Sequence, residues 1–150
     1  MPDLDRARVQ DLLHQCAQTV LETMYFATVE GRQPPDGGPV PMRWVEVRFR
    51  GDPPGVFQIG LSHEAALSVA AGFMGEDPQC PENTEDVIRE LANVVCGAVL
   101  SRLESDSSFE LGSPRLVDGP MDETDSRVAR CDLLLDCGAA AVCLRLGTVP

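Results

Sequence analysis

The stretch NTEDVIRELANVVCGAVLSRLE, from Asn83 to Glu104, decides the fold of this chain. Its apolar residues recur at helical spacing and cover most of the circumference of a helix. These positions are Val87, Ile88, Leu91, Val94, Val95, Ala98, Val99 and Leu103. A helix that is apolar on so many sides belongs at the centre of a domain. We therefore predict one long core helix over 83–104.

One narrow side of this helix is polar, and we call it the polar line. It consists of Asp86, Glu90, Asn93, Gly97, Ser101 and Glu104, at steps of three and four residues. Residues at this spacing are neighbours on a helix surface. The polar line is therefore the side that the core helix can show to solvent or to a partner.

The most specific pattern within the polar line is E-x-x-N-x-x-x-G. It places the carboxylate of Glu90 one turn from the carboxamide of Asn93, with Gly97 one turn beyond. Asn and Gly are poor helix formers in an interior position, which suggests that something else keeps them there. Two interpretations stay open. Either the line is a solvated stripe on which Gly97 lets a neighbouring helix or strand pack closely, or it is a functional site.

Composition and charge narrow the functional classes. A chain of 150 residues with 43% hydrophobic content fits one globular domain over 1–150. The formal charge is -12, and all 12 basic residues are Arg. Such a surface repels nucleic acid and anionic membranes, and it favours a protein partner with basic groups. We see neither an apolar run that could span a bilayer nor a signal peptide at Met1–Asp5.

The cysteines include no C-x-x-C pair and indicate neither disulfides nor a metal site. They are Cys16, Cys80, Cys96, Cys131, Cys137 and Cys143. We expect them to be buried, reduced thiols in a cytoplasmic protein. A phosphate-binding loop and a dinucleotide glycine fingerprint are absent from the sequence, and His14 and His63 do not stand at a metal-ligand spacing.

The rest of the chain predicts an α+β domain with a mostly antiparallel sheet around the long central helix, in the order α-β-β-α-α-β-β-β. Before the core helix we expect a helix over 4–27 capped by Asp3, a connector over 31–41, a hairpin of strands 42–50 and 55–61, and a helix over 63–74 between Ser62 and Gly75. The core helix itself is expected to be capped by Asn83. After it we expect a strand over 109–117 interrupted near 112–114, and a hairpin over 127–146 turning near 136–138. Alternation in the first hairpin places Val45, Val47 and Phe49 on one face and Trp44, Glu46, Arg48 and Arg50 on the other.

These motifs resemble the CheC/CheX family of chemotaxis phosphatases. Besides Glu90, Asn93 and Gly97, the resemblance rests on the segments VEVRFRG, GVFQIGLS, AALSVAAGFMGED and SPRLVDG. It is closest to CheX and covers about residues 42–146. Members of this family remove phosphate from the aspartyl phosphate of CheY-like response regulators.

The resemblance implies specific roles and partners. Asn93 would orient the attacking water, and Glu90 would pair with the active-site lysine of the receiver domain. Asp86, Gly97 and Ser101 would belong to the surface that the receiver contacts. The chain would need no cofactor of its own, because the receiver would supply Mg²⁺. The likeness to CheX also suggests a homodimer through one sheet edge.

One position departs from the CheC pattern. CheC proteins carry a second E-x-x-N on the first helix, where this chain has Glu22 and Tyr25. A phenol cannot present a carboxamide's donor and acceptor together. We therefore expect one active site per chain, with Tyr25 packed at the end of its helix. The alternative function is a non-catalytic module, of the receiver-binding or flagellar-switch type, that uses the polar line only for docking.

Overall fold

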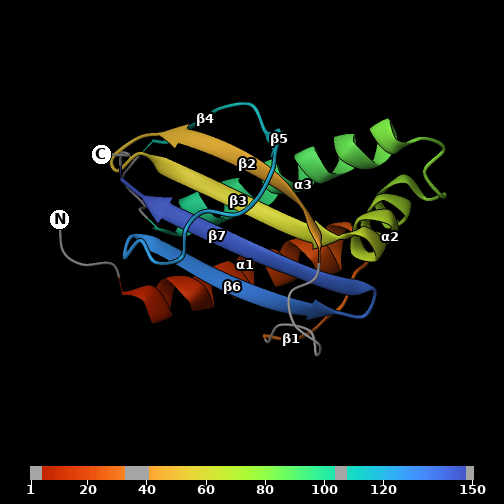
Figure 1. Ribbon diagram of the computed structural model, residues 1–150, viewed down its shortest axis with the longest axis horizontal. Helices are drawn as coiled ribbons and strands as arrows, with labels where there is room; N and C mark the ends of the chain where they lie inside the picture. Colours follow the sequence, from red (N-terminus) through yellow and green to blue (C-terminus); the bar gives the residue numbers. More distant parts are fainter. Residues whose placement is uncertain (1–4, 33–40, 104–107, 148–150) are drawn as a thin grey trace.

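The structure is a computed structural model that describes residues 5–32, 41–103 and 108–147, and Figure 1 shows its arrangement. Its helices are α1 (Arg6–Met24), α2 (His63–Met74) and α3 (Pro81–Leu103). Its strands are β1 (Val29–Gly31), β2 (Met42–Arg50), β3 (Gly55–Ser62), β4 (Glu110–Leu111), β5 (Arg115–Val117), β6 (Val128–Leu135) and β7 (Gly138–Leu146). The predicted α+β order is confirmed. The interrupted strand is β4 plus β5, and the short strand β1 is an addition.

The described strands form one antiparallel sheet. Their order is β1-β6-β7-β3-β2-β4, and β5 also pairs with β2. The two predicted hairpins, β2–β3 and β6–β7, make up most of this sheet and join where β3 pairs with β7. A short turn closes each hairpin, so the two strands of each hairpin are neighbours in the sequence as well as in the sheet.

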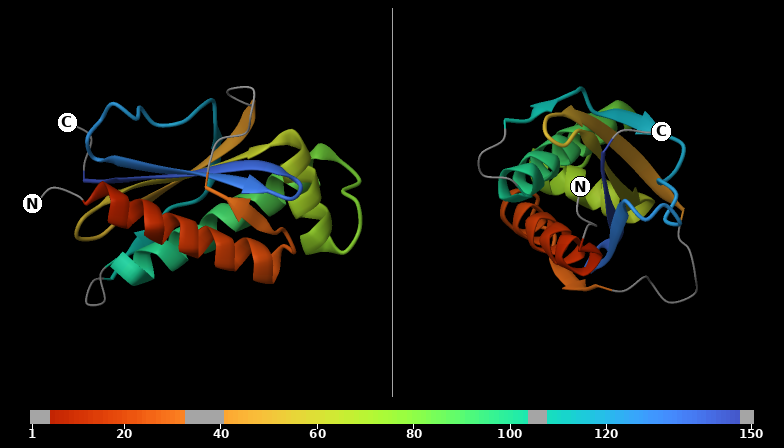
Figure 2. Two further views of the ribbon diagram at one scale, coloured as in Figure 1. Left: turned by 90° about the horizontal axis from the view of Figure 1, so that it is seen from below. Right: turned by 90° about the vertical axis from the view of Figure 1, so that its left-hand side faces the viewer.

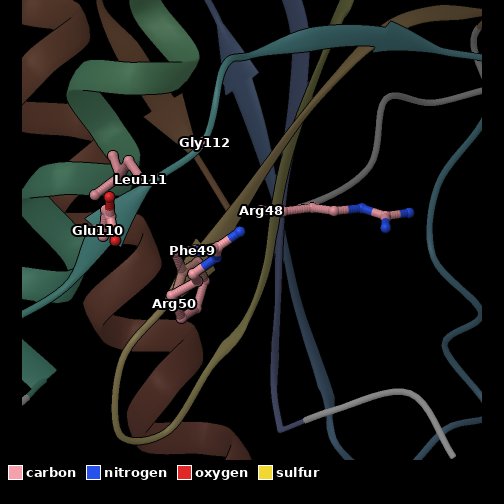
Figure 3. Close-up of a pocket in the computed structure, with 6 residues that line it drawn as sticks. All are labelled: Arg48, Phe49, Arg50, Glu110, Leu111 and Gly112. Atoms are coloured by element: carbon pink, nitrogen blue, oxygen red, sulfur yellow. The ribbon is translucent and has the colours of Figure 1, made fainter.

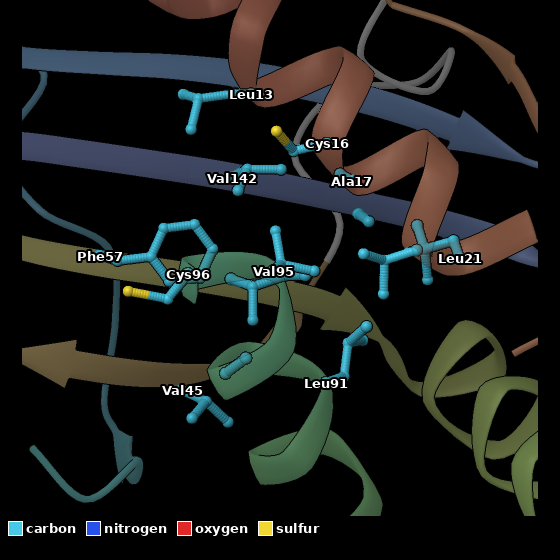
Figure 4. Packing of buried hydrophobic residues seen from close by; sticks show 14 of the residues in the cluster. Leu13, Cys16, Ala17, Leu21, Val45, Phe57, Leu91, Val95, Cys96 and Val142 are labelled. Atoms are coloured by element: carbon cyan, nitrogen blue, oxygen red, sulfur yellow. The ribbon is translucent and has the colours of Figure 1, made fainter. Parts of the chain in front are cut away.

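Helices α1 and α3 cover one face of the sheet side by side, as both views in Figure 2 show. They run in opposite directions: Arg102, near the end of α3, donates a hydrogen bond to Gln15 in the middle of α1 (2.9 Å). The apolar sides of the two helices and the inner face of the sheet form the main core (Figure 4). In this core Leu21 from α1, Leu91 from α3 and Phe57 from β3 are fully buried.

The long helix α3 is the central element that its pattern predicts. Its buried residues are Thr84, Val87, Ile88, Leu91, Ala92, Val95, Cys96, Val99 and Leu100. The predicted N-cap at Asn83 is wrong, because the helix already begins at Pro81. Proline suits the first turn, where its missing N–H leaves no hydrogen bond unmade. The predicted last residue, Glu104, lies outside the described residues.

The other two helices differ in how well their ends were predicted. Helix α2 begins after Ser62, whose hydroxyl accepts a hydrogen bond from the backbone N–H of Ala65 (3.3 Å), and ends at Gly75 with φ 78, as expected. Helix α1 ends at Met24, three residues before the predicted Ala27. Its N-cap is Asp5, because the helix begins at Arg6. The predicted cap, Asp3, lies outside the described residues, as does most of the connector over 31–41.

The outer face of the sheet is partly covered. The segment between β5 and β6 crosses this face in Figure 1. Trp44 and Glu46, on the face of β2 opposite Val45, are only 5% and 8% exposed. Trp44 packs there with Ala141 and Cys143 in a small second cluster. The alternation of β2 was read correctly, but a covering loop leaves no periodic signal in the sequence.

Glu46 ties this covering segment to the sheet. Its carboxylate accepts hydrogen bonds from Gln58 (3.0 Å) and Arg115 (3.0 Å). A third hydrogen bond comes from Arg48 (3.2 Å). Gln58 in turn accepts one from the backbone N–H of Met121 (2.8 Å). Burial by itself would raise the pKa of Glu46, but the three hydrogen bonds outweigh it and lower the pKa below its usual value.

The cysteines are all free thiols. Cys16, Cys96, Cys131 and Cys143 are buried as predicted, and Cys137 is half-buried. Cys80 is exposed, which corrects the expectation for that residue. Among the described helices, none combines the length and apolar character needed to cross a bilayer.

Candidate active site

The polar line runs along the side of α3 that points away from the sheet, opposite its buried positions. Asp86, Glu90 and Ser101 are exposed, and Asn93 and Gly97 are half-buried. The structure therefore brings these five predicted residues onto one accessible surface. Whether each has the predicted role depends on what its polar atoms already bind, which differs along the line.

Glu90 has an uncommitted carboxylate. Within the described part of the chain it forms no hydrogen bond and no ion pair, although 12 arginines are present in the sequence. The neighbouring Arg89 pairs with Asp86 (3.1 Å) and lies near Glu85 (3.9 Å) instead. Glu90 is therefore free to meet a cation from outside the chain.

Asn93 carries an unused hydrogen-bond acceptor. Its Oδ1 atom is buried and has no hydrogen-bond partner among the described residues. A buried acceptor without a partner costs about 1–3 kcal/mol. Polar atoms of this kind are uncommon in folded proteins, and each needs an explanation. An unpaired carboxamide oxygen next to a free carboxylate is suited to hold a water or a ligand atom.

The surroundings of Gly97 decide between the two interpretations of that glycine. A Cβ atom added at this position would have no atom within 4 Å, apart from its chain neighbours and the backbone of its own helix. Close packing against another described element therefore does not explain the glycine. Relative to alanine, Gly97 costs the helix about 1 kcal/mol. What the glycine provides is a bare helix surface one turn beyond Asn93.

The first and last described residues of the polar line, Asp86 and Ser101, form hydrogen bonds within their own helix. Asp86 accepts a hydrogen bond from Arg89 (3.1 Å), and the hydroxyl of Ser101 donates to the backbone carbonyl of Ala98 (2.9 Å). Both side chains are exposed, but their polar atoms are already paired. The uncommitted groups lie in the middle of the line.

A comparison with protein families matches residues 45–137 to the model described as chemotaxis phosphatase CheX. The chain belongs to the CheX family. The matched stretch contains Glu90, Asn93 and Gly97, and it spans β2 to the β6–β7 turn. The comparison with curated proteins finds no match.

Solved structures agree with the family on the fold. A CheX chemotaxis protein from Desulfovibrio desulfuricans superposes with a TM-score of 0.76 at 21% identity, covering 93% of this chain and 99% of that one. CheX from Vibrio vulnificus gives 0.75 at 20% identity, covering 95% and 99%. A CheX-CheY-BeF3-Mg complex from Borrelia burgdorferi gives 0.66 at 18% identity, covering 92% and 97%.

In this CheX-family chain, Tyr25 lies close to the candidate site. It caps the end of α1 and is 1% exposed, so its predicted packing at the helix end is confirmed. Its hydroxyl has no hydrogen-bond partner among the described residues. Burial, together with the negative charge of nearby Glu90, raises the pKa of Tyr25 to about 12. No pattern in the sequence indicates that Tyr25 and Glu90 are close, because their proximity depends on how α1 and α3 pair.

Glu22, which together with Tyr25 stands where CheC proteins carry a second E-x-x-N, forms hydrogen bonds within its own chain. Its carboxylate accepts hydrogen bonds from the backbone N–H of Val29 (3.0 Å) and from Gln18 (3.4 Å). The first of these bonds anchors β1 to α1. Glu22 and Glu90 are both exposed, but only Glu90 keeps its carboxylate free.

Two pockets lie elsewhere on this CheX-family fold. One, of about 360 Å³, lies at the sheet edge and is lined by Arg48, Phe49, Arg50, Glu110, Leu111 and Gly112 (Figure 3). In Figure 3 the side chain of Arg48 points away from the other five residues. The second, of about 320 Å³, lies beside the start of α3. No residue of the polar line lines either of these two pockets.

No metal centre is found among the described residues: they contain no group of three or more His, Cys, Asp or Glu that could hold an ion. The middle of the polar line offers the exposed negative charge of Glu90 and, one turn away, the half-buried carboxamide of Asn93, which carries an acceptor and a donor.

Proposed function

We propose that this CheX-family protein hydrolyses the aspartyl phosphate of a CheY-like response regulator, with Asn93 orienting the attacking water and Glu90 pairing with a lysine of the receiver domain. The observation that carries the proposal is that Glu90 and Asn93, three residues apart, both keep polar atoms that the described chain leaves unpaired. The bare surface at Gly97 lets a partner approach them.

The chemistry demands little from such a phosphatase. An aspartyl phosphate is an activated acyl phosphate, and in this proposal the receiver supplies Mg²⁺ and cationic groups around it. The remaining task is to hold a water in line with the bond that breaks, as a glutamine does in GTPases. The carboxamide of Asn93 can both accept a hydrogen bond from that water and donate one. The water oxygen bonds to phosphorus as the bond from phosphorus to the aspartyl oxygen breaks, so the receiver's aspartate leaves as a carboxylate and the protons of the water go to inorganic phosphate or on to solvent.

The free carboxylate of Glu90 supports the other half of the proposal. A lysine ammonium is a compact positive charge, and a carboxylate with no partner of its own can pair with it without first breaking a bond. The formal charge of -12 favours approach of a basic surface in the same way. The Borrelia burgdorferi CheX in complex with CheY supports a receiver of that type as the partner. A cytoplasmic location follows from that substrate.

Phosphate loss from a purified receiver tests this function. The receiver is phosphorylated with a small acyl phosphate in the presence of Mg²⁺, excess donor is removed, and remaining phosphoprotein is followed with and without this protein. We expect wild type to accelerate the loss. A protein that binds the phosphorylated receiver without accelerating phosphate loss would instead be the non-catalytic docking module.

The first prediction concerns Asn93→Ala. It should lower turnover by about 100-fold or more, because the water loses its orientation. It should leave the melting temperature unchanged or raise it, because alanine is the better helix former and the unpaired buried oxygen is removed.

Asn83→Ala is the matched control, since it makes the same chemical change in the first turn of the same helix. It should keep wild-type turnover. Unchanged turnover in Asn93→Ala would remove Asn93 from the mechanism.

A further inference from the structure

Phe26 is an aromatic residue in an unusual position. Its side chain is 74% exposed, and its backbone has φ 58, in the left-handed region. For a bulky residue this conformation is a strained outlier. Asparagine or glycine would fit the same turn with less strain. Neither folding nor solubility explains a phenylalanine here.

Hydrogen bonds on both sides fix the turn that holds Phe26. The backbone N–H groups of Tyr25 and Ala27 both donate to the carbonyl of Leu21 (3.2 and 3.0 Å). After the turn, Thr28 and Asp136 exchange two hydrogen bonds (3.1 and 3.0 Å). The turn is therefore anchored to the end of α1 and to the β6–β7 turn, and Phe26 is held outward.

Gly72 lets this turn lie against α2. A Cβ atom at Gly72 would run into the backbone carbonyl of Tyr25 and would lie 3.7 Å from the Cβ of Phe26. The next residue, Phe73, is 46% exposed, and its ring stacks on that of Tyr25 at 5.2 Å. Phe26 and Phe73 thus flank Tyr25, and we call these two exposed rings the Phe26–Phe73 patch.

Tyr25 connects the patch to the candidate site. Helices α1 and α3 run antiparallel (Figure 2), with Gln15 against Arg102, so Tyr25 at the end of α1 lies level with the part of α3 that carries Glu90 and Asn93. Tyr25 is 1% exposed, and the negative charge of Glu90 acts on its hydroxyl. The patch therefore lies at the level of α3 that carries the free carboxylate.

We propose that the Phe26–Phe73 patch is the apolar part of the surface that docks the response-regulator receiver, contacting apolar side chains next to the receiver's phosphorylation site. This inference rests on the proposed function. Its support is the position of the patch beside Glu90 and the strained turn that keeps Phe26 exposed.

Affinity is the reason such a patch is needed. A single ion pair from Glu90 steers a partner and is weakened by salt, whereas buried aromatic anchors supply most of the binding energy of an interface. Two rings beside the carboxylate give the docking surface that apolar centre.

Phe26→Asn tests the patch. Asparagine tolerates the left-handed conformation, so the melting temperature should hold or rise. KM for the phosphorylated receiver should rise about 10-fold, and kcat at saturating receiver should stay at the wild-type value. The rise in KM should persist at high salt, because it does not depend on charge.

Leu67→Asn is the control. It removes another exposed apolar side chain, 40% exposed on α2, which lines the pocket with Arg43 and not the patch. Its KM should match wild type.

The outcomes separate the patch from the proposed function. If wild type dephosphorylates the receiver and Phe26→Asn has an unchanged KM, the patch inference is overturned and the function stands. If wild type fails to dephosphorylate any receiver, the function falls, and the receiver as occupant of the patch falls with it. If wild type is a dimer in solution that Phe26→Asn dissociates, the occupant is a second copy and the inference is overturned.

Discussion

Glu90 and Glu22 show how much one residue's partners decide. Both are exposed glutamates on helices of the same layer. Glu22 is bonded to the backbone of Val29 and to Gln18, whereas Glu90 has no described partner of its own. Since Tyr25 stands in place of a second asparagine and is buried, we retain the expectation of one active site per chain. Exposure does not distinguish the two glutamates as candidates for a contact with a partner, whereas their hydrogen bonds do.

Glu90→Gln should raise KM and lower turnover, together by about 10-fold or more, with a larger effect at low salt. The reason is the loss of a charge-assisted contact to the receiver lysine, which neutral glutamine replaces poorly. Steady-state kinetics at two ionic strengths measure it. Glu110→Gln, at the far sheet edge, is the control for simple loss of one negative charge. Wild-type kinetics in Glu90→Gln would contradict the ion pair even if Asn93 proved essential.

Gly97→Leu should block the receiver by bulk alone. A Cβ atom at position 97 meets no described atom within 4 Å, so the leucine side chain starts in open space, and its higher helix propensity should stabilise the protein by up to ~1 kcal/mol. Affinity for the receiver should fall, because the leucine side chain would occupy space that the bound receiver needs. Thermal unfolding and a binding titration on the same variant measure both. Intact affinity with a lower melting temperature would show that the polar line is not the interface.

At the scale of elements, the antiparallel pairing of α1 and α3 assembles the candidate site. It places the end of α1, with Tyr25, beside the first half of α3, with Glu90, while Gln15 meets Arg102 at the other end. Helix α2 then packs against the end of α1 through Gly72. Three helix segments that are separate in the sequence thus contribute to one surface.

Gly72→Ala and Gly97→Ala form a matched pair that tests this packing. Alanine at 72 collides with the backbone of Tyr25 and should destabilise the protein by about 1–3 kcal/mol. Alanine at 97 has open space and should stabilise it by about 1 kcal/mol. Chemical denaturation of both variants checks the opposite signs. Equal effects at the two positions would mean that helix propensity, and not the contact between α1 and α2, governs Gly72.

Periodicity predicted the elements well because their buried faces are regular. The apolar spacing in α3, the alternation in β2 and β3, and the cap and stop signals at Ser62 and Gly75 all survive in the structure. The short strand β1 was missed because Val29–Gly31 is too brief to show alternation. The predicted N-cap at Asn83 is wrong because Pro81 itself starts the helix, which leaves Asn83 inside the first turn.

The candidate site was predictable only along the single helix that carries it. Glu90, Asn93 and Gly97 are linked by spacing within α3, so the sequence could place them on one line. The unpaired oxygen of Asn93 and the proximity of Tyr25 to Glu90 depend on tertiary packing. Exposure of Phe26 in a left-handed turn also left no pattern to read, because its neighbours come from α2 and the β6–β7 turn.

At the scale of the whole molecule, the sheet separates two polar systems. The candidate site lies on the helix layer, and the Glu46 network lies on the opposite, outer face of the sheet. The network holds the segment between β5 and β6 in place without contacting the polar line. Pairing of two copies through a sheet edge stays a prediction.

Glu46→Gln should lower stability by about 1–3 kcal/mol near neutral pH, because the charged hydrogen bonds from Arg115 and Arg48 are lost. The folded pKa of Glu46 is lowered, so its contribution is complete above the ordinary value of 4.5 and is lost as pH falls through the folded value. The difference in melting temperature between wild type and variant should therefore be constant near neutral pH and shrink in acid. A difference that does not change with pH would contradict this role.

Gly97 also bears on how this protein's relatives diverge. On the proposed function, the glycine serves the partner molecule and not the packing of the protein itself, since the described residues leave the position open. A lineage that lost its receiver would lose the selection that keeps glycine there, while the helix would gain stability from almost any replacement. Position 97 should therefore drift early, before Asn93. The residue found there in each descendant would record whether its partner still exists.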